Sequence, residues 1–318
     1  MRRTVLMLAV VATVAAGCGS APSAEKPVAP LKSLPAIGTE TTTPPSAAPS
    51  LDIPSVSVPT VEPITKVLVF VEENHSLNQM KAGMPYAYSL AEQYGYASRF
   101  TAARHPSLPN YLVMAGGQTY GVSDDKDPSS HRLRGPSVFG TAIAAGKTAG
   151  TFVDGMPKNC YTSKGGDAYV PKHNPWAYFA DERAQCDKFD VPLGALTTAI
   201  DSGALPNVGM VIPNLDNDAH DGSLGTADNW FKGWMTKIMA GPDWTSGRLV
   251  VILTADEDNR KEGNQVLTIV MNPRLHHKVV NDNFTHYSIT RLFAEVSGTE
   301  FLGGAKSAPS IQKAFGLD

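Results

Sequence analysis

Three continuous apolar runs, each followed at once by acidic and amide side chains, constrain the fold of this chain most strongly. The runs cover residues 67–71, 207–213 and 248–255, and β-branched residues are frequent in them. Apolar runs of this length are typical of strands that are buried on both faces of a sheet. Further strands are expected at 265–272 and, with a weaker pattern, at 150–154.

Helical patterns alternate with these runs. The expected helices cover residues 83–95, 107–116, 136–146, 191–202, 226–240 and 286–297. Strands that alternate with helices predict an α/β fold, with a mostly parallel sheet and helices on both faces. The stretch 117–190 is rich in glycine and proline and has few periodic elements, so we expect long surface loops there.

The N-terminal residues have the pattern of an export signal. Two arginines precede the apolar stretch Thr4 to Ala16, which is too short to span a bilayer comfortably. Small residues directly before Cys18 predict that residues 1–17 are a signal peptide and that Cys18 is lipidated; an ordinary cleaved signal is the alternative. Residues 18–63 are rich in proline, serine and alanine, which predicts a disordered tether. A globular domain is then expected at 64–318, on an exported protein that is anchored in the cell envelope or secreted.

Charge and cysteine content restrict the class of protein further. The 318 residues include 27 lysines and arginines against 30 acids, for a net charge of −3 and no long basic run. We therefore expect no nucleic-acid binding, and we expect a monomer. Cys160 and Cys186 lack the spacing of a CxxC metal site, and in an exported protein such a pair is a candidate disulfide.

The acidic clusters lie where α/β proteins bind their ligands. The sequences EENHS at 72–76, PNLDNDAHD at 213–221 and TADED at 254–258 each follow one of the three main strands. In a parallel sheet these clusters would share the edge at which the strands end. Each cluster alone could be a simple turn or helix cap. Together, however, the carboxylates would repel one another unless a cation lay among them, and oxygen ligands suit Ca²⁺, Mg²⁺, Mn²⁺ or Zn²⁺.

A serine stands at the start of an apolar helix. The segment 101–112 (TAARHPSLPNYL) enters its helix at Ser107, where free backbone N–H groups and the helix dipole would stabilise an alkoxide. Ser107 could instead serve only as a helix N-cap. The segment 169–176 (YVPKHNPW) carries Lys172 and His173, which could contact a phosphate, although this segment could equally be an exposed loop.

Five ordered motifs carry a resemblance to a known family. They are VEENHS at 71–76, HPSLPNYL at 105–112, KHNPW at 172–176, IPNLDNDAHDGS at 212–223 and TADED at 254–258. With these motifs the chain resembles the bacterial phosphoesterase family of acid phosphatases and phospholipases C, which is related to the alkaline phosphatase superfamily. The similarity runs from about Lys66 to the C-terminus. Within the family it points to secreted acid phosphatases of the mycobacterial type, which act on phosphatidylinositol 3-phosphate.

The resemblance implies a role for each matched residue. Ser107 would be the nucleophile, and its oxygen would bind a divalent metal ion together with Glu73, Asn74, Asp256 and Glu257. His173 and His220 would contact the phosphate or donate a proton. In two-metal relatives an aspartate, a histidine four residues later and a late histidine form a second site, and Asp216, His220 and His286 fit that pattern. The remaining substrate-binding candidates are His105, Asn110 and Lys172.

The activity implied by the resemblance is hydrolysis of phosphate monoesters through a phosphoserine intermediate, at acidic pH if a charged histidine donates the proton. Two alternatives remain at this point. A phospholipase C would use similar residues on a phosphodiester, and a non-enzymatic cation- or phosphate-binding lipoprotein would need the acidic clusters but not Ser107. A sulfatase is disfavoured because no Cys-x-Pro-x-Arg segment is present.

Overall fold

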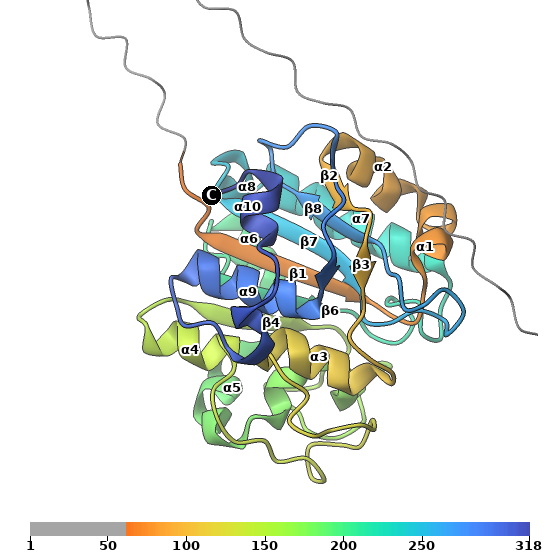
Figure 1. The fold of residues 1–318 in the computed structure, drawn as a ribbon. Helices are drawn as coiled ribbons and strands as arrows, with labels where there is room; N and C mark the ends of the chain where they lie inside the picture. The colour runs from red at the N-terminus through yellow and green to blue at the C-terminus, as the bar shows by residue number, and fades with distance from the viewer. Residues whose placement is uncertain (1–61) are drawn as a thin grey trace, which may run out of the picture. The chain divides into compact units, whose positions relative to one another are not determined.

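The computed structural model describes residues 62–318. These residues fold around an eight-stranded sheet (Figure 1). In spatial order its strands are β5 (Asp190–Pro192), β4 (Ala149–Val153), β6 (Val208–Ile212), β1 (Lys66–Glu72), β7 (Leu249–Ala255), β8 (Thr268–Met271), β2 (Gly95–Ala97) and β9 (Lys278–Val280). All neighbouring pairs are parallel except those of β8, which is antiparallel to β7 and β2. The expected mostly parallel α/β sheet is therefore confirmed.

Strand β1 lies at the centre of this sheet, between β6 and β7. Phe70 is level with Val211 on one side and with Leu253 on the other. The apolar side chains of all three strands are almost completely buried, as their continuous hydrophobic runs predict. Because the three strands are parallel, the polar segments that follow them emerge at one edge of the sheet.

Helices cover both faces of the sheet. One layer contains α3 (Ser107–Gly116), α4 (Val138–Ala144), α9 (His286–Ser297) and α10 (Ile311–Phe315). The other layer contains α1 (Leu77–Gly83), α2 (Pro85–Gln93), α6 (Ala195–Asp201), α7 (Leu224–Ala240) and α8 (Pro242–Thr245). Phe231 of α7 packs edge-on against Phe70 of β1, with ring centroids 5.2 Å apart, and so joins this second layer to the sheet. None of the helices within residues 62–318 is long and apolar enough to cross a membrane.

A two-stranded parallel sheet fixes the start of α9. It pairs β3 (Phe100–Thr101) with β10 (Phe284–Thr285), and it brings the segment that leads into α3 next to the N-terminus of α9. Helix α9 begins directly after β10, at His286, and the backbone N–H of its N-cap residue Thr285 donates to the hydroxyl of Ser288, the third residue of the helix.

The stretch 117–190 has more regular structure than the expected long surface loops. The expected helix at 136–146 and strand at 150–154 are α4 and β4, but the stretch also contains α5 (Arg183–Phe189) and three short 3₁₀ helices, η1 (Pro171–His173), η2 (Pro175–Tyr178) and η3 (Ala180–Glu182), which were not expected. Trp176 is fully buried, stacks on Phe139 at 4.7 Å between ring centroids, and donates its indole N–H to Glu182 at 2.9 Å. Burial of aromatic side chains therefore orders a segment that lacks any sequence periodicity.

The expected bridge between Cys160 and Cys186 is present, and both residues are fully buried. It closes a loop that carries Lys172 and His173. The expected signal peptide and the lipidation residue Cys18 lie outside the described residues, as does all but the last part of the expected tether at 18–63.

Candidate active site

Four segments meet at the edge where the central strands end. Glu73 follows β1, Asp218 follows β6, Asp256 follows β7, and Ser107 begins α3. Backbone hydrogen bonds join the strand ends directly: the N–H of Glu73 donates to the carbonyl of Asp218 at 2.8 Å, and the N–H of Asp256 donates to the carbonyl of Glu72 at 2.9 Å. The acidic clusters therefore share one edge, as their positions after parallel strands predicted.

Ser107 is the first residue of α3, and its side chain does not cap the helix. Pro106 occupies the N-cap position, and its side chain forms no hydrogen bond with the first turn of the helix. The Ser107 hydroxyl instead donates to Glu73 Oε2 at 3.0 Å and is only 2% exposed. The backbone N–H of Leu108 is occupied by Asp125 Oδ1 at 2.9 Å. Ser107 thus donates its hydroxyl hydrogen to the acidic cluster, and its oxygen lies at the positive end of a helix.

Glu73 is the most highly connected carboxylate of this cluster. Its Oε1 accepts from the Tyr111 hydroxyl at 2.7 Å and lies 3.1 Å from His173 Nε2, while its Oε2 accepts from Ser107 and, at 3.2 Å, from Asn74 Nδ2. Burial alone would raise the pKa of Glu73, but the charge and hydrogen bond of His173 lower it to about 2. Glu73 is therefore ionised although it is completely buried.

Asp256 and Glu257 supply further carboxylates. Asp256 Oδ1 accepts from the backbone N–H groups of Asn74 at 3.1 Å and of Glu257 at 2.6 Å, whereas its Oδ2 is buried with no hydrogen-bond partner. Burial, followed by the charges of Glu73 and Glu257, raises the pKa of Asp256 well above its usual value. Burial also raises the pKa of Glu257. Crowded carboxylates, an unpartnered oxygen and a nearby hydroxyl form a set of oxygen donors that fits a divalent cation.

His173 lies behind Glu73 and is held on both sides. Its Nδ1 is 3.1 Å from Asp218 Oδ2, its Nε2 contacts Glu73, and its ring stacks on Tyr111. Burial lowers the pKa of His173, but the two carboxylates outweigh burial and raise it to about 9. One carboxylate oxygen of Glu73, one ring nitrogen of His173 and one carboxylate oxygen of Asp218 lie within 4.8 Å of one another, close enough to bind one metal ion. Because the two carboxylates contact different ring nitrogens, the geometry is that of a charged imidazolium bridging two anions.

Lys172 and His220 are more exposed to solvent than His173 is. Lys172 Nζ is 3.3 Å from His220 Nε2 and 3.7 Å from Asp125 Oδ2, and His220 Nδ1 is 2.7 Å from Asp221 Oδ1. Lys172 and His220 line a cavity of about 300 Å³ together with Asp125, Asp127, Lys164 and Leu215. We call the group of Ser107, Glu73, Tyr111, His173, Asp218, Asp256 and Glu257 the Ser107 cluster. The cavity lies beside this cluster, because Asp125 also accepts the backbone N–H of Leu108, the residue that follows Ser107.

Two expected substrate-binding residues support the cluster instead of facing the cavity. His105 Nδ1 is 3.0 Å from Glu257 Oε2, and its Nε2 is 3.2 Å from Asp258 Oδ1. Asn110 accepts from the N–H of Arg104 at 2.8 Å and donates to Glu257 Oε2 at 3.3 Å. Both side chains therefore fix the turn before Ser107 relative to Glu257.

The structure does not bring Asp216 or His286 to the Ser107 cluster. Asp216 is exposed, and Asp218, two residues later, takes the buried position beside His173. His286 is fully buried, with Nε2 at 3.0 Å from the carbonyl of Ala255 and Nδ1 accepting from the N–H of Ala103 at 3.4 Å. Burial lowers the pKa of His286 to about 4, so its neutral ring joins the end of β7 to the segment before α3.

Sequence reasoning missed Tyr111 and Asp218 as members of the cluster. A signal for Tyr111 was available, because a helix that begins at Ser107 places residues three and four positions later on the same face as Ser107. For Asp218, several acids stand close together in NLDNDAHD, and their spacing alone does not say which of them turns inward.

Comparison with known proteins identifies relatives of this chain. A model of the Phosphoesterase family matches residues 74–298. A phosphatidylinositol-3-phosphatase from Mycobacterium tuberculosis is 28% identical over 273 residues, which are 85% of this chain and 88% of the relative. A phosphate-repressible acid phosphatase from Penicillium chrysogenum is 28% identical over 233 residues, which are 67% of this chain but 54% of the relative. The chain thus spans about half the length of this fungal relative.

Solved structures resemble the fold at low sequence identity. A protein of the alkaline phosphatase superfamily from Vibrio parahaemolyticus is 9% identical, with a TM-score of 0.52 over 80% of this chain and 72% of that one. The lipoteichoic acid synthase LtaP from Listeria monocytogenes is 10% identical, with a TM-score of 0.52 over 74% and 72%. These likenesses concern the fold alone. The family match, however, spans most of the described chain, including Ser107, Asp256 and Glu257, and the chain belongs to the Phosphoesterase family of phosphoric ester hydrolases.

Proposed function

We propose that this protein is an exported acid phosphatase that hydrolyses phosphate monoesters through a phosphoserine at Ser107. The contact between the Ser107 hydroxyl and Glu73 Oε2, at the start of α3 and among buried carboxylates, is the observation that carries the proposal. The names of the relatives from M. tuberculosis and P. chrysogenum support a phosphatase, and the first of them makes phosphatidylinositol 3-phosphate a substrate to test.

The proposed metal site consists of Glu73, Asn74, Asp256 and Glu257, with the Ser107 oxygen as a further ligand. A divalent cation bound there would neutralise charge on the serine oxygen and on the phosphoryl group being transferred. Glu73 Oε2 is positioned to accept the Ser107 proton as the hydroxyl attacks phosphorus. Tyr111 and His173 hold the other oxygen of Glu73, so this carboxylate keeps its orientation during the reaction.

Of the two histidines expected to act on the substrate, His220 is better placed to exchange protons with it. His220 is exposed beside Lys172, whereas His173 is 1% exposed and bound by two carboxylates. In the proposed first step His220 protonates the leaving alkoxide, and the serine–phosphorus bond forms as the ester bond breaks. In the second step water attacks phosphorus and gives its proton to His220, the serine–phosphorus bond breaks, and the Ser107 oxygen regains its proton from Glu73 as inorganic phosphate is released.

Two further parts of the proposal concern the location and layout of the protein. We propose a signal peptide at 1–17, a tether at 18–63 that begins with a lipidated Cys18, and a catalytic domain at 64–318. A membrane anchor of this kind would hold the active site near lipid substrates. Mass determination of the N-terminal peptide from the envelope fraction tests this layout.

The decisive experiment compares Ser107→Ala with Ser202→Ala, which changes an exposed serine after α6. We expect Ser107→Ala to lose at least about a thousandfold in kcat for p-nitrophenyl phosphate, because the nucleophile is removed, and to incorporate no labelled phosphate. Near wild-type turnover by Ser107→Ala would exclude the proposal. Release of inorganic phosphate, and not of phosphocholine, from the corresponding lipids distinguishes a monoesterase from a phospholipase C.

A further inference from the structure

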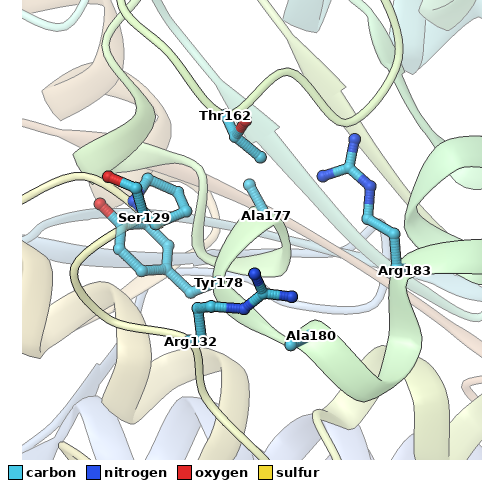
Figure 2. Close-up of a pocket in the computed structure, with 8 residues that line it drawn as sticks. Ser129, Arg132, Thr162, Ala177, Tyr178, Ala180 and Arg183 are labelled. Carbon is cyan, nitrogen blue, oxygen red and sulfur yellow. The ribbon is translucent and has the colours of Figure 1, made fainter.

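A second cavity, of about 400 Å³, lies outside the Ser107 cluster and has a cationic lining (Figure 2). Its walls are formed by Pro128, Ser129, Arg132, Thr162, Ala177, Tyr178, Ala180 and Arg183. Figure 2 shows the guanidinium groups of Arg132 and Arg183 at the same opening, approaching it from different segments. None of the lining residues is acidic, and none lines the cavity beside Ser107.

Arg132 differs from Arg183 and from nearby Arg134 in how its charge is neutralised. Arg134 is paired with Asp181 at 2.9 Å, and Arg183 uses one nitrogen for Asp187 at 2.9 Å. Arg132 forms no ion pair with any of residues 62–318. Among the described residues, the ion pair of Arg183 with Asp187 is the only ion pair that these two guanidinium groups form, and the positive charge that remains favours an oxyanion beside them.

The other walls of the cavity are fixed by the segment from η2 to η3, of which η2 is fully buried. The N–H of Leu133 donates to the carbonyl of Tyr178, and the N–H of Ala180 donates to the carbonyl of Leu133, each at 2.9 Å. The Tyr178 hydroxyl donates to the carbonyl of Lys126, also at 2.9 Å. These bonds tie the backbone next to Arg132 to the segment that supplies Ala177 and Ala180. The cavity is therefore preformed, with an apolar wall and hydroxyl groups from Ser129 and Thr162.

We propose that this cavity is a binding site for a small organic anion, separate from the catalytic site. The arginines would bind its phosphate or carboxylate group in bidentate fashion, and its apolar part would pack against Tyr178 and Ala177. The site does not depend on the proposed reaction, since no residue of the Ser107 cluster takes part in it.

Calorimetric titration of the full-length, metal-loaded protein with phenylphosphonate tests the proposal, because this probe combines an oxyanion with an aromatic ring and cannot be hydrolysed as an ester. We expect two binding events, one at the catalytic site and one at the arginine cavity. Arg132→Gln and Arg183→Gln should each weaken only the second event, by about tenfold or more. Arg134→Gln, which changes the neighbouring paired arginine, should leave both events unchanged, and hydrolysis of p-nitrophenyl phosphate should be unaffected by all three substitutions.

Arg132→Lys gives an independent test that keeps the positive charge. It should also lose most of the affinity of the second event, because lysine cannot form the bidentate contact. Titrations with inorganic phosphate and with benzoate then separate a preference for phosphate from one for carboxylate. The proposal would be overturned if no binding event of the wild-type protein were weakened by the double substitution Arg132→Gln/Arg183→Gln, whether the wild-type titration shows one event or two.

Discussion

The ring of Tyr111 lies parallel to the imidazole of His173, with centroids 5.2 Å apart, and both side chains contact the same oxygen of Glu73. Because both side chains contact Oε1, the other oxygen of Glu73, Oε2, faces Ser107. Two aromatic groups from segments 62 residues apart thus set the orientation of one carboxylate. The orientation of Glu73, and not only its charge, should then matter for turnover.

Tyr111→Phe tests this relationship, because it keeps the stacked ring and removes the hydrogen bond to Glu73. We expect kcat for p-nitrophenyl phosphate to fall about 10- to 100-fold, since hydrogen bonds to charged groups contribute roughly 1.5–3 kcal/mol. Tyr88→Phe, which changes a half-buried tyrosine of α2, is the matched control. Unchanged kinetics in Tyr111→Phe would mean that His173 alone is sufficient to hold Glu73.

Removal of the proposed metal ion should destabilise the protein as well as inactivate it. Without a cation, burial and mutual repulsion act on Asp256 and Glu257, whose pKa values are raised. Adding a divalent ion at about 100 times its Kd should contribute about 2.7 kcal/mol and raise the Tm of the chelated protein by about 5–10 °C. Asp256→Asn should lose this response in a thermal melt. A Tm that is the same with and without every divalent ion tested would argue against a metal site here.

His220 should matter most for substrates whose leaving group needs a proton. We expect His220→Asn to lower kcat for glycerol phosphate about 100-fold, because an alkoxide leaves poorly without protonation. For p-nitrophenyl phosphate, whose phenolate leaves readily, the loss should be about tenfold or smaller. His277→Asn, which changes a surface histidine that contacts the carbonyl of Glu92, serves as the control. Equal losses on both substrates would exclude His220 as the general acid.

Asp190 should make stability fall as pH rises through the weakly acidic range. Burial raises the pKa of this carboxyl to about 7, although Thr151 and Asn174 donate hydrogen bonds to it. The folded protein therefore holds a proton that the unfolded chain releases near pH 4, so the free energy of unfolding decreases between about pH 4 and 7 and is level above that range. A shift of this size corresponds to about 4 kcal/mol.

The substitution Asp190→Asn should remove that part of the pH dependence and raise the Tm at pH 7 relative to the wild-type protein. Thermal melts of both proteins from pH 4 to 8 provide the measurement. Asp201→Asn, at an exposed position at the end of α6, is the control. If the Tm difference between Asp190→Asn and wild type is the same at pH 4 and pH 7, the raised pKa is wrong.

The central part of the fold could be predicted because long apolar runs leave few choices. The expected strands at 67–71, 207–213 and 248–255 are β1, β6 and β7, and they are neighbours in the sheet. Strands β2 and β9 have three residues each, which is too short for a periodic pattern to be seen. The buried 3₁₀ helix η2 was not predicted, because the prolines and glycines around it suggested loops. Its position depends on the burial of Trp176 and Tyr178, which no sequence periodicity indicates.

The candidate site could be predicted where one residue follows directly from a strand end. Glu73 and Asp256 are fixed in this way, since the parallel register of β1 and β7 brings their segments together. Asp218 and His286 depend on how longer loops and a separate helix pack, which no spacing along the chain encodes. The position of His286 is set by the pairing of β3 with β10, between segments more than 180 residues apart.

All ten residues of α3 are buried, from Ser107 to Gly116. The helix that presents the serine is thus also a component of the hydrophobic interior, so few substitutions in it can be accepted without loss of folding. Selection or engineering for new substrates would have to work on the more exposed residues that line the neighbouring cavity, such as Lys172, Lys164 and His220. Related proteins that keep this core would therefore keep the reaction, while substitutions at the more exposed cavity residues would change which ester is hydrolysed.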